Sequence, residues 1–250
     1  MELRQVSAMN GWGWIVGGFQ LFRQTPVIWL VLFLVYLLIG MALSIVPVVG
    51  PIMLNLLAPV FIAGFMLGCR ALDAGEDLEI NHLFGGFKQN TAQLITVGGI
   101  YLAGMIAVVG VILLTGGGDA LSAVLKQDPA AQNAAISASA GEGFLLASML
   151  GLSCLLPLVM AYWFAPPLVV FNDMKAVDAM KLSLTACVRN WRPFLVYSLI
   201  TMALMLLAAL PLGLGLLVMI PTMTASLYVS YRDIFSVDFV EAETTAATES

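Results

Sequence analysis

Residues 172–194 read Asn-Asp-Met-Lys-Ala-Val-Asp-Ala-Met-Lys-Leu-Ser-Leu-Thr-Ala-Cys-Val-Arg-Asn-Trp-Arg-Pro-Phe and are predicted to form an amphipathic helix. One side carries apolar residues at steps of three and four: Val177, Met180, Leu184, Cys187 and Trp191. The other side carries polar and charged residues: Asp178, Lys181, Thr185, Arg189 and Arg192. The chain then has no charged residue over 193–231. A basic amphipathic helix that leads into a membrane hairpin is therefore the expected unit of the fold.

The composition predicts a membrane protein. The chain is 61% hydrophobic and 10% charged, whereas soluble domains are about a quarter charged. Four blocks contain no Asp, Glu, Lys or Arg: residues 24–69, 89–118, 143–172 and 193–231. Because a bilayer span takes about 20 apolar residues, the first and last blocks hold two spans each and the middle blocks one each. We expect an all-α polytopic protein with six transmembrane helices, and an ordinary soluble domain is excluded.

One integral membrane domain is predicted over residues 1–233. Its six spans are expected at 26–46, 52–69, 91–115, 144–165, 194–210 and 213–231. Residues 234–250 are predicted to be a disordered tail on the cytoplasmic side, with four carboxylates and no cation. No short apolar region with a small-residue cleavage site precedes the first span, so we expect this span to stay as an anchor.

Amphipathic segments precede the first, third and fifth spans. They are expected at residues 1–25, at about 77–89 with Asp77 as N-cap, and at 172–192. The first contains Trp12 and Trp14, which are predicted to lie in the headgroup layer. Three short matches align the segments: Phe22-Arg23-Gln24, Phe87-Lys88-Gln89 and Val188-Arg189-Asn190. They predict a threefold repeat of interfacial helix and hairpin, in which the middle turn is expanded into a loop at 116–143.

The cations predict the orientation. Six spans would place nine of them on one side: Arg4, Arg23, Arg70, Lys88, Lys175, Lys181, Arg189, Arg192 and Arg232. The other side would carry Lys126 alone. Because short cytoplasmic loops are enriched in Lys and Arg, both termini are expected in the cytoplasm.

No catalytic, cofactor or metal site is predicted. His82 has no H-E-x-x-H partner, and no G-x-S-x-G serine is present. Cys69, Cys154 and Cys187 are isolated and show no metal-ligand spacing. No charged residue is predicted in the middle of a span, which lowers the expectation of an ion-coupled carrier. We expect a protein that is not an enzyme and has no nucleic-acid partner.

The basic amphipathic helices are the positive functional signal. Five cations are predicted to contact anionic phospholipid headgroups: Lys181, Arg189, Arg192, Lys88 and Arg23. Each cation near an anionic membrane surface contributes about 1 kcal/mol. The alternative interpretation is that these residues only set the topology. Separately, Gly64 and Gly68 form a G-x-x-x-G pair that predicts close helix packing, although it also fits a chain with many glycines.

A family resemblance adds to this interpretation. Residues 163–173, Trp-Phe-Ala-Pro-Pro-Leu-Val-Val-Phe-Asn-Asp, and 179–195, which include the Arg-Asn-Trp-Arg-Pro-Phe segment, resemble uncharacterised multi-pass inner-membrane proteins of Gram-negative bacteria. They are more distantly similar to the membrane domain of glycerophosphodiester phosphodiesterases. The resemblance implies a bacterial inner-membrane location and carries over no catalytic residue.

Two functional interpretations follow. The leading hypothesis is a non-catalytic membrane component that engages the lipid bilayer, anionic phospholipid or a membrane-protein partner. The alternative is a permease for a small or apolar solute, since Pro157, Pro211 and Pro221 could break spans and build a site.

Overall fold

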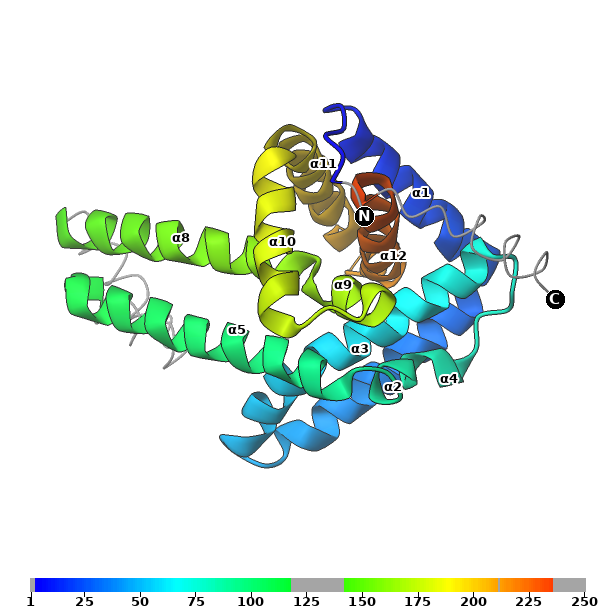
Figure 1. The fold of residues 1–250 in the computed structure, drawn as a ribbon, viewed down its shortest axis with the longest axis horizontal. Helices are drawn as coiled ribbons and strands as arrows, with labels where there is room; N and C mark the ends of the chain where they lie inside the picture. The colour runs from blue at the N-terminus through cyan, green and yellow to red at the C-terminus, as the bar shows by residue number, and fades with distance from the viewer. Residues whose placement is uncertain (1–2, 118–141, 211, 236–250) are drawn as a thin grey trace.

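The computed structural model describes residues 3–117, 142–210 and 212–235, and this part of the chain is helical and contains no strand. The helices in chain order are α1 (Asn10–Gln24), α2 (Pro26–Ser44), α3 (Val49–Asp73), α4 (Ile80–Leu83), η1 (Gly85–Phe87), α5 (Thr91–Ile112), η2 (Leu113–Gly117), α8 (Glu142–Trp163), α9 (Ala165–Asn172), α10 (Ala176–Arg189), α11 (Trp191–Ala209) and α12 (Leu216–Phe235) (Figure 1). The predicted all-α polytopic class is confirmed.

Among the described residues, five segments are long and apolar enough to cross a membrane. They are Pro26–Ser44, Val49–Asp73, Thr91–Thr115, Ala147–Asn172 and Trp191–Ala209. α12, which covers the sixth predicted span, is not among them, so the count of six stays a prediction. Most of the predicted 116–143 loop, Pro211 and the tail beyond Phe235 lie outside the described residues.

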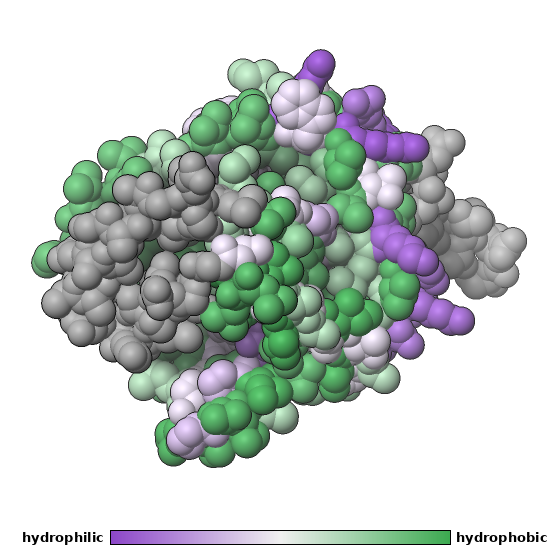
Figure 2. Space-filling model, turned by 90° about the vertical axis from the view of Figure 1, so that its left-hand side faces the viewer, coloured by the Kyte–Doolittle hydropathy of each residue, from purple (hydrophilic) through white to green (hydrophobic). Residues whose placement is uncertain are grey.

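The long helices form three hairpins, α2–α3, α5–α8 and α11–α12. The α5–α8 hairpin projects from the rest of the molecule, and α2 and α3 run side by side in another direction (Figure 1). The outer surfaces of the hairpins are apolar, as Leu37 and Leu206 illustrate with 57% and 67% of their surface exposed. Figure 2 looks onto the end of the molecule from which α5 and α8 project, and shows apolar residues over most of the described surface, with hydrophilic ones along one edge. Such exposed apolar surface is what lipid chains cover in a bilayer.

The shorter helices gather at one end of the hairpins, which we name the polar end. α4 and η1 pack on α3, α10 packs on α8 and α5, and α1 packs on α12 and α11. Each amphipathic segment therefore contacts the hairpin of the preceding unit, and the first segment contacts the hairpin of the last. This cyclic order fits the predicted threefold repeat, which stays a prediction.

Two residues with left-handed backbone conformation join the second and third units. Asn90 precedes α5 with φ 53°, and Asp173 follows α9 with φ 52°. Asn and Asp are the non-glycine residues that adopt this conformation most readily. The Asn90 amide donates a hydrogen bond of 2.6 Å to the Asp173 carboxylate. Because of this turn, the stretch that starts at Asn172 is not one helix: α10 begins only at Ala176.

The buried side of α10 also differs from the predicted stripe. Val177 and Trp191 are 49% and 55% exposed, whereas the buried side consists mostly of small residues: Ala176, Ala179, Met180, Ser183, Ala186 and Cys187. Small side chains let α10 lie close to α8. There the Ser183 hydroxyl donates to the carbonyl of Met160 over 2.6 Å and accepts from the N–H of Phe164 over 2.9 Å.

The prediction that Trp14 lies in the headgroup layer is wrong. Trp14 is 1% exposed and its indole N–H donates a 2.8 Å hydrogen bond to the Asp233 carboxylate. The reason is a close approach of α1 to α12. A Cβ added at Gly18 would lie 2.5 Å from the carbonyl oxygen of Thr222, so the glycine lets the two helices pack backbone against backbone. Trp12, on the opposite side of α1, is 45% exposed.

Two predicted boundaries also need correction. Glu79, not Asp77, caps α4, because its side chain and that of His82 form a reciprocal capping box, with the Glu79 N–H donating to His82 Nδ1 over 3.0 Å. The tail was predicted to start at residue 234, but α12 continues to Phe235, and both Ile234 and Phe235 are buried in the core.

Candidate functional site

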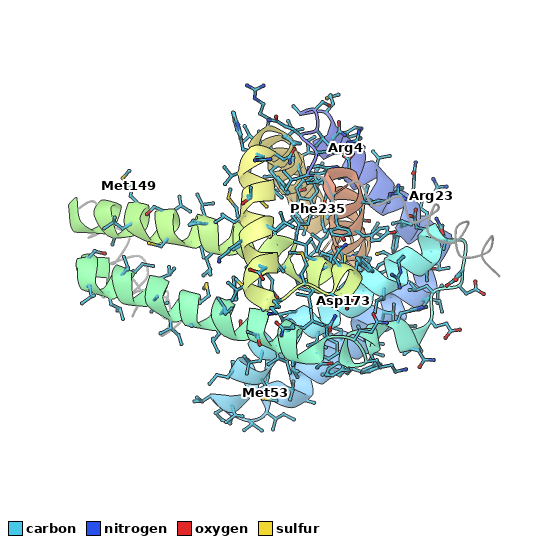
Figure 3. The ribbon with its side chains drawn as sticks, viewed as in Figure 1. Arg4, Arg23, Met53, Met149, Asp173 and Phe235 are labelled. Carbon is cyan, nitrogen blue, oxygen red and sulfur yellow. The ribbon has the colours of Figure 1, made fainter. Side chains whose placement is uncertain are left out.

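Side-chain hydrogen bonds between distant segments concentrate at the polar end. Figure 3 places Arg4, Arg23 and Phe235 in this part of the molecule, and Met53 and Met149 far out on two hairpins. The helix ends that meet there come from all three units, so the polar end is where residues far apart in sequence are brought together.

An ion pair connects the ends of α3 and α12. The Arg232 guanidinium pairs with the Asp73 carboxylate, which also accepts a 3.1 Å hydrogen bond from the Tyr228 hydroxyl. One turn earlier on α3, the Arg70 guanidinium lies 5.0 Å from the ring centroid of Phe171. Asp73 and Arg232 are 159 positions apart, and no local sequence pattern indicates that they meet.

The N-terminal strap, residues 3–9, crosses from α12 to the bend between α10 and α11. The Arg4 N–H donates to the carbonyl of Ile234 over 2.8 Å. The buried Asn190 side chain accepts from the Val6 N–H over 2.9 Å and donates to the Arg4 carbonyl over 3.1 Å. The Gln5 amide donates to the carbonyl of Arg189 over 3.1 Å. The strap therefore fixes Arg4 beside the bend that carries Arg189 and Arg192.

The five predicted lipid-contacting cations are all exposed, and the structure does not gather them into one cluster. Arg23 lies in the last turn of α1 and Lys88 directly follows η1, while Lys181, Arg189 and Arg192 lie on or just after α10. None of the five forms an ion pair with a described carboxylate. Their charge is therefore available to an external anion as far as the described residues are concerned.

Exposed aromatic rings accompany these cations at each junction between an amphipathic segment and the next span. The Arg23 guanidinium lies 5.8 Å from the ring centroid of Phe19, and that of Arg192 lies 5.6 Å from Trp191. Lys88 directly follows Phe87, which is 41% exposed. Aromatic rings favour the headgroup layer of a bilayer, and cations favour its phosphates.

Gly64 and Gly68 face α4 and the segment before it rather than another long helix. A Cβ added at Gly64 would lie 2.2 Å from the carbonyl oxygen of Leu83, and one added at Gly68 would lie 2.6 Å from the Leu78 side chain. Among the long helices, a comparable approach occurs at Gly98, where an added Cβ would lie 2.7 Å from the carbonyl oxygen of Leu56. The G-x-x-x-G pair thus lies at the contact between α3 and the second amphipathic segment.

Within the described ranges, no group of three or more His, Cys, Asp or Glu side chains is close enough to hold a metal ion.

Cys69 and Cys187 are buried and Cys154 is exposed. Burial raises the pKa of the Cys187 thiol to about 12, against the opposing effect of its contact with Ser183. This thiol is therefore protonated at neutral pH.

The apolar hairpins and the polar end define a multi-pass α-helical membrane protein. The chain is 37% identical to a probable inner membrane protein of Burkholderia thailandensis over 258 aligned positions, which cover 95% of each chain. It belongs to the family of this inner membrane protein. No family model matches the chain, and no solved structure matches it at a significant level.

Proposed function

We propose that the protein is a non-catalytic component of the inner membrane that engages anionic phospholipid through its polar end, with both termini in the cytoplasm. The observation that carries the proposal is the recurrence of an exposed aromatic residue with an exposed cation at all three junctions: the ring lies near the cation at Arg23 and Arg192, and Phe87 directly precedes Lys88 in the sequence. The nine cations of the predicted cytoplasmic side support the orientation.

The electrostatics of the junctions support headgroup binding. A guanidinium can donate two parallel hydrogen bonds to a phosphate, and each cation near an anionic surface contributes about 1 kcal/mol. A cation that forms an ion pair within the protein is less available to a phosphate, as Arg232 is because of its pair with Asp73. The junction cations form no ion pair with a described carboxylate, so they are available to lipid phosphates as far as the described residues are concerned.

The test replaces Lys181, Arg189 and Arg192 together by Gln in the full chain. Native mass spectrometry of protein released from nanodiscs of phosphatidylcholine and phosphatidylglycerol should then show phosphatidylglycerol retention at least about tenfold lower than in the wild type. A matched control removes exposed charges of the other sign with Glu76→Gln and Asp77→Asn, and it should not lower retention. Unchanged retention by the folded triple variant would contradict the proposal.

Other roles have less support. α8 continues through Pro157 and α12 through Pro221, so neither described proline provides the broken span on which the permease hypothesis depends. Solute flux into proteoliposomes that empty vesicles lack would favour that alternative. The polar end could instead bind a membrane-protein partner, and co-purification of such a partner from the native membrane would test this alternative.

A further inference from the structure

We infer that Arg4, Arg189 and Arg192 form one site for a lipid that carries two phosphate groups, as in cardiolipin. This inference rests on the proposed function and makes it more specific, because it names one place and one class of headgroup. It differs from the general attraction of scattered cations, since it depends on the N-terminal strap.

The strap brings together arginines that are far apart in the sequence. The main chain of Arg4 makes two hydrogen bonds: its N–H donates to the carbonyl of Ile234, and its carbonyl accepts from the side-chain amide of Asn190. Asn190 is itself 1% exposed and lies between Arg189 and Arg192 in the chain. The main chain of Arg4 is therefore in contact with the bend from which the other two arginines extend, and all three residues are exposed at the surface.

The three arginines at this bend form no ion pair with a described carboxylate. The nearest carboxylate along α12 is Asp233, which accepts hydrogen bonds of 2.8 Å from both Asn10 and Trp14 and is thus bound to α1. The hydrogen bonds of the strap hold the main chain of Arg4 at the bend that carries the other two arginines. Like charges that extend from one place favour a multivalent anion, because each guanidinium can bind phosphate oxygens.

The apolar surroundings favour a lipid over a soluble phosphate. Val188 and Trp191 at the bend are 56% and 55% exposed, and Leu195 in the next turn of α11 is 52% exposed. These side chains offer exposed apolar contact next to Arg189 and Arg192 in the sequence, and two of them belong to the candidate membrane span Trp191–Ala209. A two-phosphate headgroup at the arginines would leave its acyl chains alongside α11.

The experiment compares two sets of nanodiscs with equal total lipid charge. One contains phosphatidylcholine with cardiolipin, and the other contains phosphatidylcholine with twice as many phosphatidylglycerol molecules. Native mass spectrometry of the released full-length protein gives the ratio of retained cardiolipin to phosphatidylglycerol. We expect about a tenfold preference for cardiolipin in the wild type, and we expect Arg4→Gln to lower it about fivefold, as Arg189→Gln and Arg192→Gln should.

Matched variants separate this site from general attraction. Lys175→Gln removes an exposed cation elsewhere, directly before α10, and should leave the preference unchanged. Asn190→Ala keeps all three arginines but releases the strap, and it should lower the preference as Arg4→Gln does. Asn190→Ala therefore tests whether the position of the strap matters, independently of the charge of Arg4.

The outcomes distinguish the inference from the proposed function. Equal retention of the two lipids by the wild type, or a full preference in the folded Arg4→Gln protein, would overturn the two-phosphate site and leave general anionic-lipid binding in place. If the wild type retained neither lipid, both the two-phosphate site and the proposed anionic-lipid function would be overturned. A loss of preference that is as large in Lys175→Gln as in Arg4→Gln would also overturn the inference, because it would show additive attraction without a site.

Discussion

Asn190 joins the N-terminal strap to the bend between α10 and α11. Its amide oxygen accepts from Val6, and its amide nitrogen donates to the carbonyls of Arg4 and Ala186. The side chain is almost completely buried, so removal of the amide would leave main-chain groups of the strap without partners in a poorly hydrated place.

We predict that Asn190→Ala lowers the free energy of unfolding by about 2 kcal/mol and exposes the N-terminal strap. Limited proteolysis should cut residues 3–9 of the variant faster than those of the wild type, and the thermal midpoint in detergent should fall. Asn81→Ala is the matched control, since Asn81 is exposed and its amide makes one 3.4 Å contact with Glu79. Equal proteolysis of both variants would contradict the role of Asn190.

Cys187 provides a second test at the residue scale. Its raised pKa of about 12, compared with an ordinary value of 9.0, arises from burial against α8. We therefore predict slow maleimide labelling of Cys187 at pH 8 until the protein unfolds, since the thiolate is the reactive form. Thr185→Cys in a Cys187→Ser background places a thiol on the exposed side of the same helix and should be labelled rapidly.

The raised pKa of Cys187 also predicts how the stability of the protein depends on pH. Because the folded state holds the Cys187 proton more tightly than the unfolded state, the thiol's contribution to stability is complete below pH 9 and is lost as the pH rises towards 12. Cys187→Ala should therefore reduce the alkaline loss of stability in thermal melts between pH 8 and pH 11. An identical pH profile of the two proteins would contradict the assignment.

At the scale of elements, the contact between α1 and α12 depends on glycine. An added Cβ at Gly18 meets the main chain of α12 at Thr222 and Ser226, whereas one at Gly13 meets nothing within 4 Å. Main chain cannot move aside as a flexible side chain can, so an alanine at Gly18 requires the two helices to separate.

We predict that Gly18→Ala destabilises the protein by about 1–3 kcal/mol. Gly13→Ala, on the open side of the same helix, should stabilise it by up to about 1 kcal/mol because alanine is the better helix former. Thermal unfolding in detergent micelles checks both values. A stabilised Gly18→Ala protein would show that the helices do not approach as closely as described.

At the scale of the whole molecule, the polar end and the C-terminal tail carry opposite charge. Residues 236–250 contain Asp238, Glu241, Glu243 and Glu249 and no Lys or Arg. They follow directly after the end of α12, where the carbonyl of Ile234 accepts the hydrogen bond from Arg4. Along the chain, four carboxylates therefore follow the segment that Arg4 contacts, and we expect their charge to oppose the approach of anionic lipid.

We predict that deletion of residues 236–250 raises the association rate of the protein's polar end with cardiolipin-containing vesicles about two- to fivefold at low salt. The difference should disappear at 1 M salt, where the Debye length is about 3 Å. Stopped-flow measurements with a fluorescent cardiolipin analogue check both statements. A rate that is unaffected by the deletion at low salt would show that the tail does not act on the site.

The sequence by itself determined the class of the molecule and the position of its long helices. Four uncharged blocks can only be buried or lie in a bilayer, and a bilayer admits helices whose backbone groups are paired within the segment. The positions of Lys181, Arg189 and Arg192 at the surface also followed from the pattern around Asn190, because a cation next to an apolar span is too costly to bury.

Only the tertiary structure decided which side of α10 is buried, why Trp14 lies inside, and that Arg4 joins Arg189 and Arg192. Alanine, serine and glycine give a weak apolar signal in a sequence, yet their small size determines how closely helices such as α1 and α12 approach. The contact of Arg4 with Asn190 joins residues 186 positions apart, and no local period encodes such a pairing. Helix formation in a membrane depends on local hydropathy, whereas a site between helices depends on the packing of segments that are distant in the chain.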